Sequence, residues 1–224
     1  MATNLQILND RLASQYPTSG VNFHVALVLD NRSTFTFTAN ASTDVITTSA
    51  NHDFLTNMPI TVSGANLPAP LTATGTYYAR DITANTFKLA LTAGGVAIDL
   101  TTAGTGVMTC SDVALNETYT DLSWWVRKEI SSYQGVGNRQ VFTPVAPTID
   151  WVNKFVRIQQ TVAFNNTSGS LGIVFDKALL IRGGSATRGN TTGLFDSYWA
   201  FSGSQTIAAT ENRGIIIPLE LRNG

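Results

Sequence analysis

The chain has 224 residues, a net charge of −1 and 13% charged residues, about half the share that is usual in a soluble domain. This length is enough for one large core or two smaller ones. The near-neutral charge excludes proteins that coat nucleic acid or bind a membrane surface through a basic field. One cysteine, Cys110, and two histidines, His24 and His52, are too few for a zinc cluster or a dithiol pair. We therefore expect no cofactor, no metal, and neither a nucleic-acid nor a membrane partner.

The first forty residues predict a short helix and two strands. Apolar residues recur at helical spacing from Leu5 to Tyr16 and stop at Pro17, which indicates a docking helix capped by Thr3 or Asn4. Apolar and polar residues then alternate over residues 21–29 and again over 34–38. We expect these two strands to form a hairpin with its turn at residues 30–33.

The composition changes between about residues 44 and 110, where short apolar pairs are separated by Thr, Ala, Gly and Asn. Turns are expected at Gly94-Gly95 and at Gly104-Thr105-Gly106. The pattern predicts a compact module of about five short strands. The expected strands are residues 45–48, 59–62, 76–81, 86–90 and 106–109.

Several segments of this module carry a family resemblance. They are residues 44–47 (DVIT), His52 with Leu55, 76–78 (TYY), 82–89 (ITANTFKL), Gly94-Gly95 and 98–99 (ID). Together they resemble a small β module that occurs repeatedly in virion proteins of tailed bacteriophages. The resemblance covers about a third of the chain and departs from the usual form at His52-Asp53, where a His-Gly pair is common. It implies a virion structural protein that is made in the host cytoplasm.

A second helix is expected after the module, capped by Thr118 or Thr120, with an apolar stripe that runs from Leu122 to Tyr133 and an end at residues 135–137. On this helix Trp124 would lie on the polar face, beside Lys128. A tryptophan there is explained either by a loop of the same chain that covers it or by a neighbouring subunit. We predict a subunit contact at Trp124 and Lys128, with the intramolecular explanation left open.

Long alternating strands follow at residues 154–164, 171–181 and 215–221, and Pro218 suggests that the last of them is a sheet edge. Because strands lie on both sides of the module, the predicted fold is mainly β. We expect a discontinuous, jelly-roll-like β-sandwich host domain (residues 1–40 and 111–224) with an inserted small β module (residues 41–110) and two short helices. Residues 179–193 weakly resemble other phage structural proteins.

Catalytic constellations are weak in this sequence. The loop from Gly184 to Thr191 imitates a phosphate-binding loop, but Asn190 stands where the lysine would be needed. No nucleophile is singled out near either histidine. Three carboxylates, Asp176, Asp196 and Glu211, leave glycoside hydrolysis open as a minor alternative. We expect a protein that is not an enzyme.

The aromatic residues Trp151, Tyr198 and Trp199 leave a further alternative, because an aromatic ring can stack on the apolar face of a sugar. The favoured hypothesis is a non-enzymatic component of a tailed-phage virion. It would dock on the capsid or tail as a decoration or tail-associated protein, with other virion proteins and copies of itself as partners. The low charge agrees with this, since interface cores are depleted of charged residues. The competing hypothesis is a receptor- or glycan-binding tail tip or fibre protein.

Overall fold

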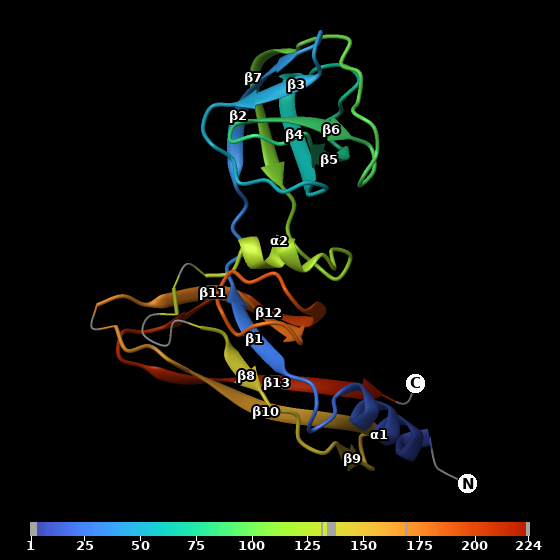
Figure 1. The fold of residues 1–224 in the computed structure, drawn as a ribbon, viewed down its shortest axis with the longest axis vertical. Coiled ribbons are helices and arrows are strands. Elements are labelled where there is room, and N and C mark those ends of the chain that lie inside the picture. Colours follow the sequence, from blue (N-terminus) through green and yellow to red (C-terminus); the bar gives the residue numbers. More distant parts are fainter. Residues whose placement is uncertain (1–3, 131, 134–137, 169, 223–224) are drawn as a thin grey trace. The chain divides into compact units, whose positions relative to one another are not determined.

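The structure, a computed structural model, describes residues 4–130, 132–133, 138–168 and 170–222. The chain is mainly β and divides into two compact units (Figure 1). One unit, called the sandwich below, comprises Met1–Asp30 and Glu117–Gly224. The other, called the barrel, comprises Asn31–Asn116. The barrel is therefore inserted in the sequence of the sandwich.

The sandwich consists of two antiparallel sheets and two helices. Its four-stranded sheet has the order β12 (Leu194–Ile207), β11 (Ile173–Arg182), β1 (Phe23–Val28) and β8 (Gln140–Phe142). Its three-stranded sheet has the order β13 (Asn212–Arg222), β10 (Phe155–Asn165) and β9 (Thr148–Asp150). The helices are α1 (Asn4–Gln15) and α2 (Leu122–Arg127).

The two sheets of the sandwich enclose one hydrophobic core. Alternation along β10 buries Val156, Ile158 and Val162 and leaves Arg157 and Thr161 exposed, as expected from the sequence. The core-facing side chains of β1 and β11, among them Val25 and Leu180, belong to the same cluster. The predicted sandwich is therefore confirmed by side chains that both sheets contribute to one core.

Helix α1 supplies further apolar surface to this core. Leu5 and Leu12 keep 5% and 2% of their surface, and Tyr16, just past the helix, keeps 5%. These positions follow the predicted helical spacing. The docking helix inferred from the sequence is confirmed.

Strand β1 is buried on both faces, although its sequence predicts alternation. Phe23, Val25 and Leu27 face the core, while His24 and Val28 are covered from the other side. Glu129 forms an isolated bridge with Val28, and the His24 ring contacts the Gly183 carbonyl group. Segments from distant parts of the chain thus cover the face that sequence alone would expose.

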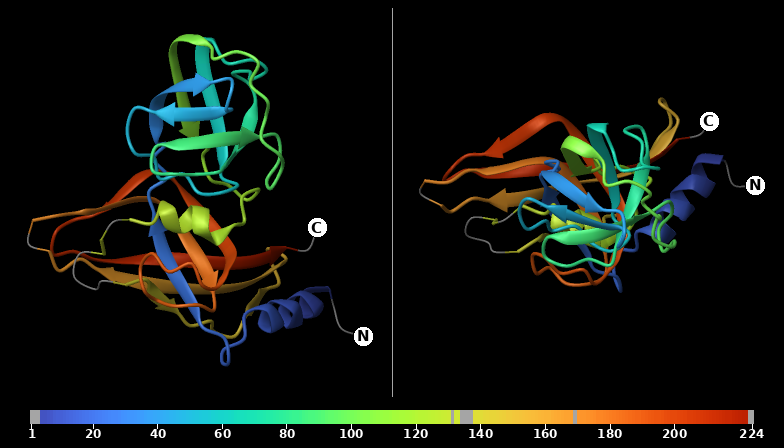
Figure 2. Two further views of the ribbon diagram at one scale, coloured as in Figure 1. Left: turned by 45° about the horizontal axis from the view of Figure 1, so that its top comes forward. Right: turned by 90° about the horizontal axis from the view of Figure 1, so that it is seen from above.

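The barrel is a closed antiparallel sheet, and Figure 2 shows its strands wrapped around a common interior. The strand order around it is β2 (Thr34–Asn40), β3 (Val45–Thr48), β6 (Thr86–Ala90), β5 (Thr76–Arg80), β4 (Pro59–Asn66) and β7 (Thr105–Asp112). Ile46, Ile60, Phe87 and Cys110 have no exposed surface and fill the interior. The five strands expected in the module are all present, and the predicted bounds of β3 and β6 are those observed.

The sixth barrel strand, β2, corrects two expectations. Phe37 pairs with Thr48 of β3 and Met108 of β7, and β2 makes no pairing with β1. The hairpin predicted at residues 30–33 is therefore wrong, since this segment passes from one unit to the other. The boundaries lie at 30/31 and 116/117 instead of 40/41 and 110/111, because β2 and the whole of β7 are needed to close the barrel.

Two further differences concern local structure. Asp121 is the N-cap of α2, with its Oδ1 accepting a hydrogen bond from the Ser123 amide at 2.9 Å, so neither Thr118 nor Thr120 is the cap. Strand β12 was not predicted from the sequence. Its pairing with β11 is interrupted between Ala200 and Gln205, where a bulge breaks the alternation.

Candidate functional site

A groove in the sandwich brings together two of the three aromatic residues proposed for sugar stacking. It has a volume of about 220 Å³ and lies between α1, β12 and β13. Tyr198 and Trp199 of β12 line it together with Tyr16. The remaining lining residues are Leu12, Gln15, Ser197, Pro218, Leu219, Glu220 and Leu221.

The polar ends of these aromatic side chains are occupied within the chain. The Tyr198 hydroxyl donates to Glu117 Oε2 at 2.9 Å, and the Trp199 indole N–H donates to the Pro218 carbonyl at 3.2 Å. The Tyr16 hydroxyl donates to Asp196 Oδ2 at 2.6 Å. Their hydrogen-bond donors are therefore used within the chain, and a ligand would meet their ring surfaces.

Ionisation of the Tyr16 phenol is strongly suppressed. Burial raises the pKa of Tyr16 most, and the hydrogen bond and negative charge of Asp196 raise it further. Asp196 also lies 3.5 Å from the Nε of Arg182. The phenol is therefore a fixed donor that ties α1 to β12.

The third aromatic residue proposed for sugar stacking, Trp151, lies apart from this groove. It occupies the turn after β9, is 53% exposed and precedes Val152, which is 85% exposed. Asp150 orders this turn by accepting hydrogen bonds from the Val152 and Asn153 amides. Trp151 is not among the residues that line the groove.

The proposed subunit contact at Trp124 and Lys128 is not supported by their exposure, because each keeps only 7% of its surface. Trp124 packs against the Tyr119 ring, with the ring centroids 5.8 Å apart. Helix α2 ends at Arg127, and Lys128 has non-helical torsion angles. The expected polar face assumed a helix that continued to Tyr133. That assumption is wrong, and the intramolecular explanation applies to Trp124.

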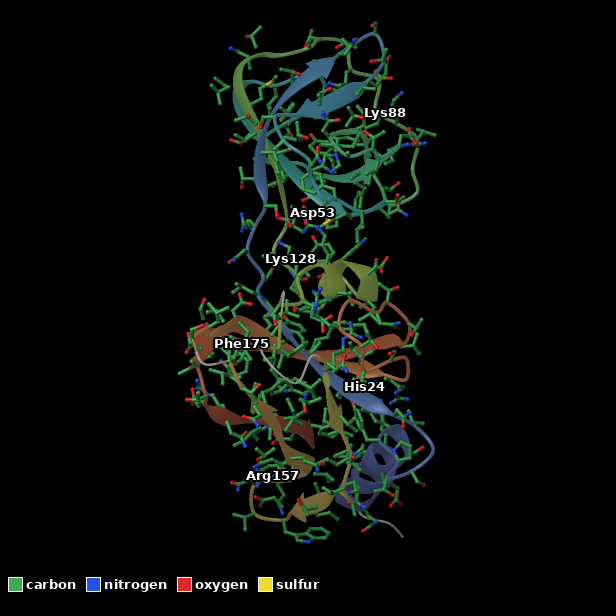
Figure 3. The ribbon with its side chains drawn as sticks, turned by 60° about the vertical axis from the view of Figure 1, so that its left-hand side comes forward. His24, Asp53, Lys88, Lys128, Arg157 and Phe175 are labelled. Carbon is green, nitrogen blue, oxygen red and sulfur yellow. The ribbon has the colours of Figure 1, made fainter. Side chains whose placement is uncertain are left out.

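Lys128, which directly follows α2 (Figure 3), belongs to a charge cluster in which Lys128 and Asp30 are buried and Lys177 and Asp176 are partly exposed. Its Nζ lies 3.6 Å from Asp30 Oδ1, and the Nζ of Lys177 lies 3.0 Å from Asp30 Oδ2. Asp176 accepts from the Asp30 amide at 2.9 Å and lies 3.4 Å from Lys177 Nζ. The charges of two carboxylates and two ammonium groups thus compensate one another at Asp30, the last residue of the first sandwich segment.

A second charge pair, Glu129 with Arg139, has no exposed side-chain surface. The guanidinium donates to both carboxylate oxygens, at 2.9 and 2.8 Å, and Glu129 also accepts from the Tyr133 hydroxyl. The Gly189 amide donates to Glu129 Oε2 at 2.8 Å. In the loop from Gly184 to Thr191, which imitates a phosphate-binding loop, the Gly189 amide therefore already binds the Glu129 carboxylate.

The residues considered for catalysis are dispersed and engaged elsewhere. Buried His24 has a lowered pKa, mainly because of desolvation. His52 stacks on Phe54 with the ring centroids 4.8 Å apart and lies edge-on to Phe87. Burial raises the pKa of the Cys110 thiol to about 12. Among the described residues, no three His, Cys, Asp or Glu side chains are grouped so as to hold a metal ion.

The three carboxylates considered for glycoside hydrolysis also have separate partners. Asp176 contacts Lys177, Asp196 contacts Tyr16, and Glu211 accepts from the Ala208 amide at 2.6 Å. None of the three lines the aromatic groove. In the described part of the chain, no helix is long and apolar enough to cross a membrane.

Comparisons with known proteins add no assignment. No protein-family model matches the chain, and no curated protein or solved structure matches it significantly.

Proposed function

We propose that this chain is a non-enzymatic structural component of a tailed-phage virion, which docks on the capsid or tail through subunit contacts of the sandwich and carries the barrel as an inserted module. One observation carries the proposal. The segments that resemble the recurrent phage module, from Asp44 to Asp99, all lie within one closed barrel. A module that recurs within different host domains must fold on its own. A closed sheet can do so, because all its strands pair with one another and none has to come from the host domain.

The surface of the sandwich is suited to side-chain contacts with neighbours. Its strands and connecting turns expose several large apolar side chains outside the groove. They include Val141, Trp151, Val152, Leu171, Val174, Leu194 and Ile216. Each would contribute modestly, and the symmetry of a particle would multiply the contacts between copies.

Labelling of intact particles tests this proposal. A short epitope inserted between Ala73 and Thr74, which are exposed in a barrel turn, leaves every barrel strand intact. We expect antibody-labelled particles to carry the label at many symmetry-related positions, and we expect mass spectrometry to find the chain in many copies. Purified particles that lack the chain would contradict the proposal.

The aromatic groove favours a second function, the binding of a host glycan. Tyr198 and Trp199 present ring surfaces there, and Gln15 and Glu220 are polar groups in the same lining. A glycan array probed with the intact chain and with Trp199→Ala separates the two functions. The structural function predicts no specific glycan signal, whereas a signal that Trp199→Ala abolishes would favour a receptor-binding protein.

A further inference from the structure

The charge cluster at Asp30 also has the composition of a reactive site. It brings two carboxyl groups, of Asp30 and Asp176, together with two primary amines, of Lys128 and Lys177. A lysine amine that has lost a proton is a nucleophile, and the carbon of a protonated carboxyl group is an electrophile. All four residues belong to the sandwich, so the site is complete within one unit.

The buried ion pair elsewhere in the sandwich provides a comparison. There Glu129 is paired with Arg139, whose guanidinium donates to both carboxylate oxygens. Arginine stays charged and fits a carboxylate by its geometry, whereas lysine can lose its proton in a buried site. Arginine would therefore serve charge compensation at Asp30 as well. The two lysines place a nucleophilic group beside the carboxyl group of Asp30, which the arginine pair does not.

Lys177 lies closest to the carboxyl group of Asp30. Its Nζ is 3.0 Å from Asp30 Oδ2, and the Nζ of Lys128 is 3.6 Å from the other oxygen, Oδ1. The Asp30 side chain keeps only 1% of its surface, and those of Lys128 and Lys177 keep 5% and 13%. Solvent therefore has little access to the carboxyl carbon, while the Lys177 nitrogen is already in contact with the group.

The backbone holds these two side chains in place. Lys177 on β11 is paired with Val28 of β1, two residues before Asp30, and Figure 1 shows the two strands side by side. The Asp30 amide also donates to Asp176 Oδ1 at 2.9 Å. Reacting groups that are held in a good orientation reach effective molarities of about 10⁵–10⁸ M. Amine and carboxyl group are thus placed to react with each other rather than with solvent.

The other two members of the cluster lie where a reaction would need them. Asp176 Oδ2 is 3.4 Å from Lys177 Nζ, the same nitrogen that contacts Asp30. An attacking amine must lose a proton and the departing oxygen must gain one, and a carboxylate at the nitrogen can make both transfers. The Lys128 ammonium group, near Asp30 Oδ1, can stabilise the negative charge that develops on this oxygen.

We infer that Lys177 and Asp30 form an intramolecular amide bond. The Lys177 ammonium group first passes a proton to Asp30 Oδ2, which turns the ion pair into a neutral amine and a carboxylic acid. Nζ then attacks Cγ of Asp30, and the C–N bond forms. Asp176 takes a second proton from the nitrogen and gives it to the Oδ2 hydroxyl group, which leaves as water. The product is a secondary amide, and the chain becomes lighter by one water molecule.

The position of this bond suggests what it does. Asp30 is the last sandwich residue before the barrel, so the amide ties the connection at residues 30 and 31 to β11. A force on the barrel through residue 31 would then reach β11 through a covalent bond, without loading β1. A link across such a long loop also restricts the unfolded chain. The inference concerns the sandwich alone and does not rest on the proposed function.

Mass spectrometry of the purified full chain tests the inference. We expect the denatured chain to be lighter than its sequence by one water molecule, and we expect its proteolytic digest to contain a branched peptide with both Asp30 and Lys177. A chain that keeps its full mass after prolonged incubation in the folded state would overturn the inference. So would the loss of water without the branched peptide, because a succinimide at Asp30 changes the mass in the same way.

Lys177→Arg is the most informative variant. It keeps a positive charge beside Asp30 but removes the amine, so we expect a folded sandwich with full mass. Lys154→Arg provides a matched control, since Lys154 is exposed in the turn between β9 and β10, and this variant should still lose the water molecule. Equal loss of water by the two variants would overturn the inference. Tryptophan fluorescence of both variants shows whether the sandwich is folded.

Asp176→Asn tests the proton transfer separately from the fold. Asparagine can still accept a hydrogen bond from the Asp30 amide, but it cannot take a proton from Lys177. The linked fraction, sampled during cell-free synthesis of the chain, should form about 10²–10⁴-fold more slowly in this variant. Asp176→Glu, which restores a carboxylate, should recover part of the rate. Equal rates in Asp176→Asn and the unchanged chain would overturn this route to the bond.

Discussion

The two units of this protein solve the problem of free strand edges in different ways. The barrel closes its sheet, so each of its strands is paired on both sides. The sandwich leaves β12 and β13 at sheet edges, and it protects them locally. Pro218, which has no amide hydrogen, lies on β13 with its carbonyl bound by the Trp199 indole, and β12 carries a bulge. The closed barrel therefore has no strand edge to protect, whereas the sandwich depends on particular residues to keep its edge strands from pairing with other chains.

The units also differ in how they bury polar groups. The barrel buries His52, Thr48 and Asp112, which bond mainly to backbone atoms; the Asp112 carboxylate, for example, accepts from the Ser33 amide at 2.9 Å. The sandwich buries the Glu129–Arg139 pair. Substitutions of buried charges should therefore affect the sandwich most. All four tryptophans lie in the sandwich, so tryptophan fluorescence follows its unfolding separately from that of the barrel.

The largest effect is expected from separating the buried ion pair. Arg139→Met leaves the Glu129 carboxylate uncompensated in the core and should lower the free energy of unfolding of the sandwich by about 3–5 kcal/mol. Urea unfolding followed by tryptophan fluorescence measures this change. The double variant with Glu129→Met should lose much less than the sum of the two single variants. Strictly additive losses would show that the two side chains do not act as a pair.

A smaller effect is expected from pH acting on His24. Burial lowers the pKa of His24 in the folded chain below its usual value of about 6.5, so the unfolded chain binds the proton more readily. The resulting stability is fully present above about pH 6.5 and is lost as the pH falls towards the folded pKa, by at most about 1.4 kcal/mol per pH unit. His24→Asn, which can still donate to the Gly183 carbonyl, should flatten this part of the profile. An unchanged slope would assign the pH dependence to other groups.

The hydrogen bond from the Trp199 indole to the Pro218 carbonyl on the β13 edge should contribute about 1 kcal/mol to the free energy of unfolding. Trp199→Phe keeps an aromatic ring in the groove but removes the indole donor to the Pro218 carbonyl. We expect a modest fall in the urea midpoint of the sandwich and an increase in self-association measured by sedimentation. A fall in stability without any new association would mean that this bond stabilises the fold but does not guard the edge.

The smallest effect on stability is expected for Pro218→Thr, within about 0.5 kcal/mol, because Pro218 is exposed. This substitution returns an amide hydrogen to the free edge of β13. Combined with Trp199→Phe, it should increase association more than either change alone. If the double variant scatters no more light than Trp199→Phe alone, Pro218 does not protect the β13 edge.

The sequence predicted those elements whose pattern depends only on local periodicity. Alternation from Val156 to Phe164 identified β10, and the helical spacing of Leu5 and Leu12 identified α1. Pro218 correctly indicated a sheet edge. Local pattern does not specify partners, however. The alternation around Phe37 predicted a strand but could not show that it pairs with β3 and β7 instead of β1.

The candidate site was predicted less well than the fold. Tyr198 and Trp199 do meet in one groove, yet the groove also needs Tyr16, which is 182 positions before Tyr198 in the sequence. Trp124 was placed on an exposed face because the apolar spacing continued beyond Arg127, where the helix ends. The spacing of side chains shows which residues could share a face, but the end of a short helix is set by its tertiary contacts.

We expect the barrel and the sandwich to fold as separate units with boundaries at 30/31 and 116/117. The most direct test joins Asp30 to Glu117 through a flexible Gly-Ser linker and measures urea unfolding by tryptophan fluorescence. We predict one cooperative transition at the midpoint of the sandwich in the full chain. A parallel deletion that joins Ala41 to Asp112 should aggregate. It keeps β2 but removes β3 and nearly all of β7, which are the strands that pair with β2. Aggregation or non-cooperative unfolding of the Asp30–Glu117 deletion would contradict the claim.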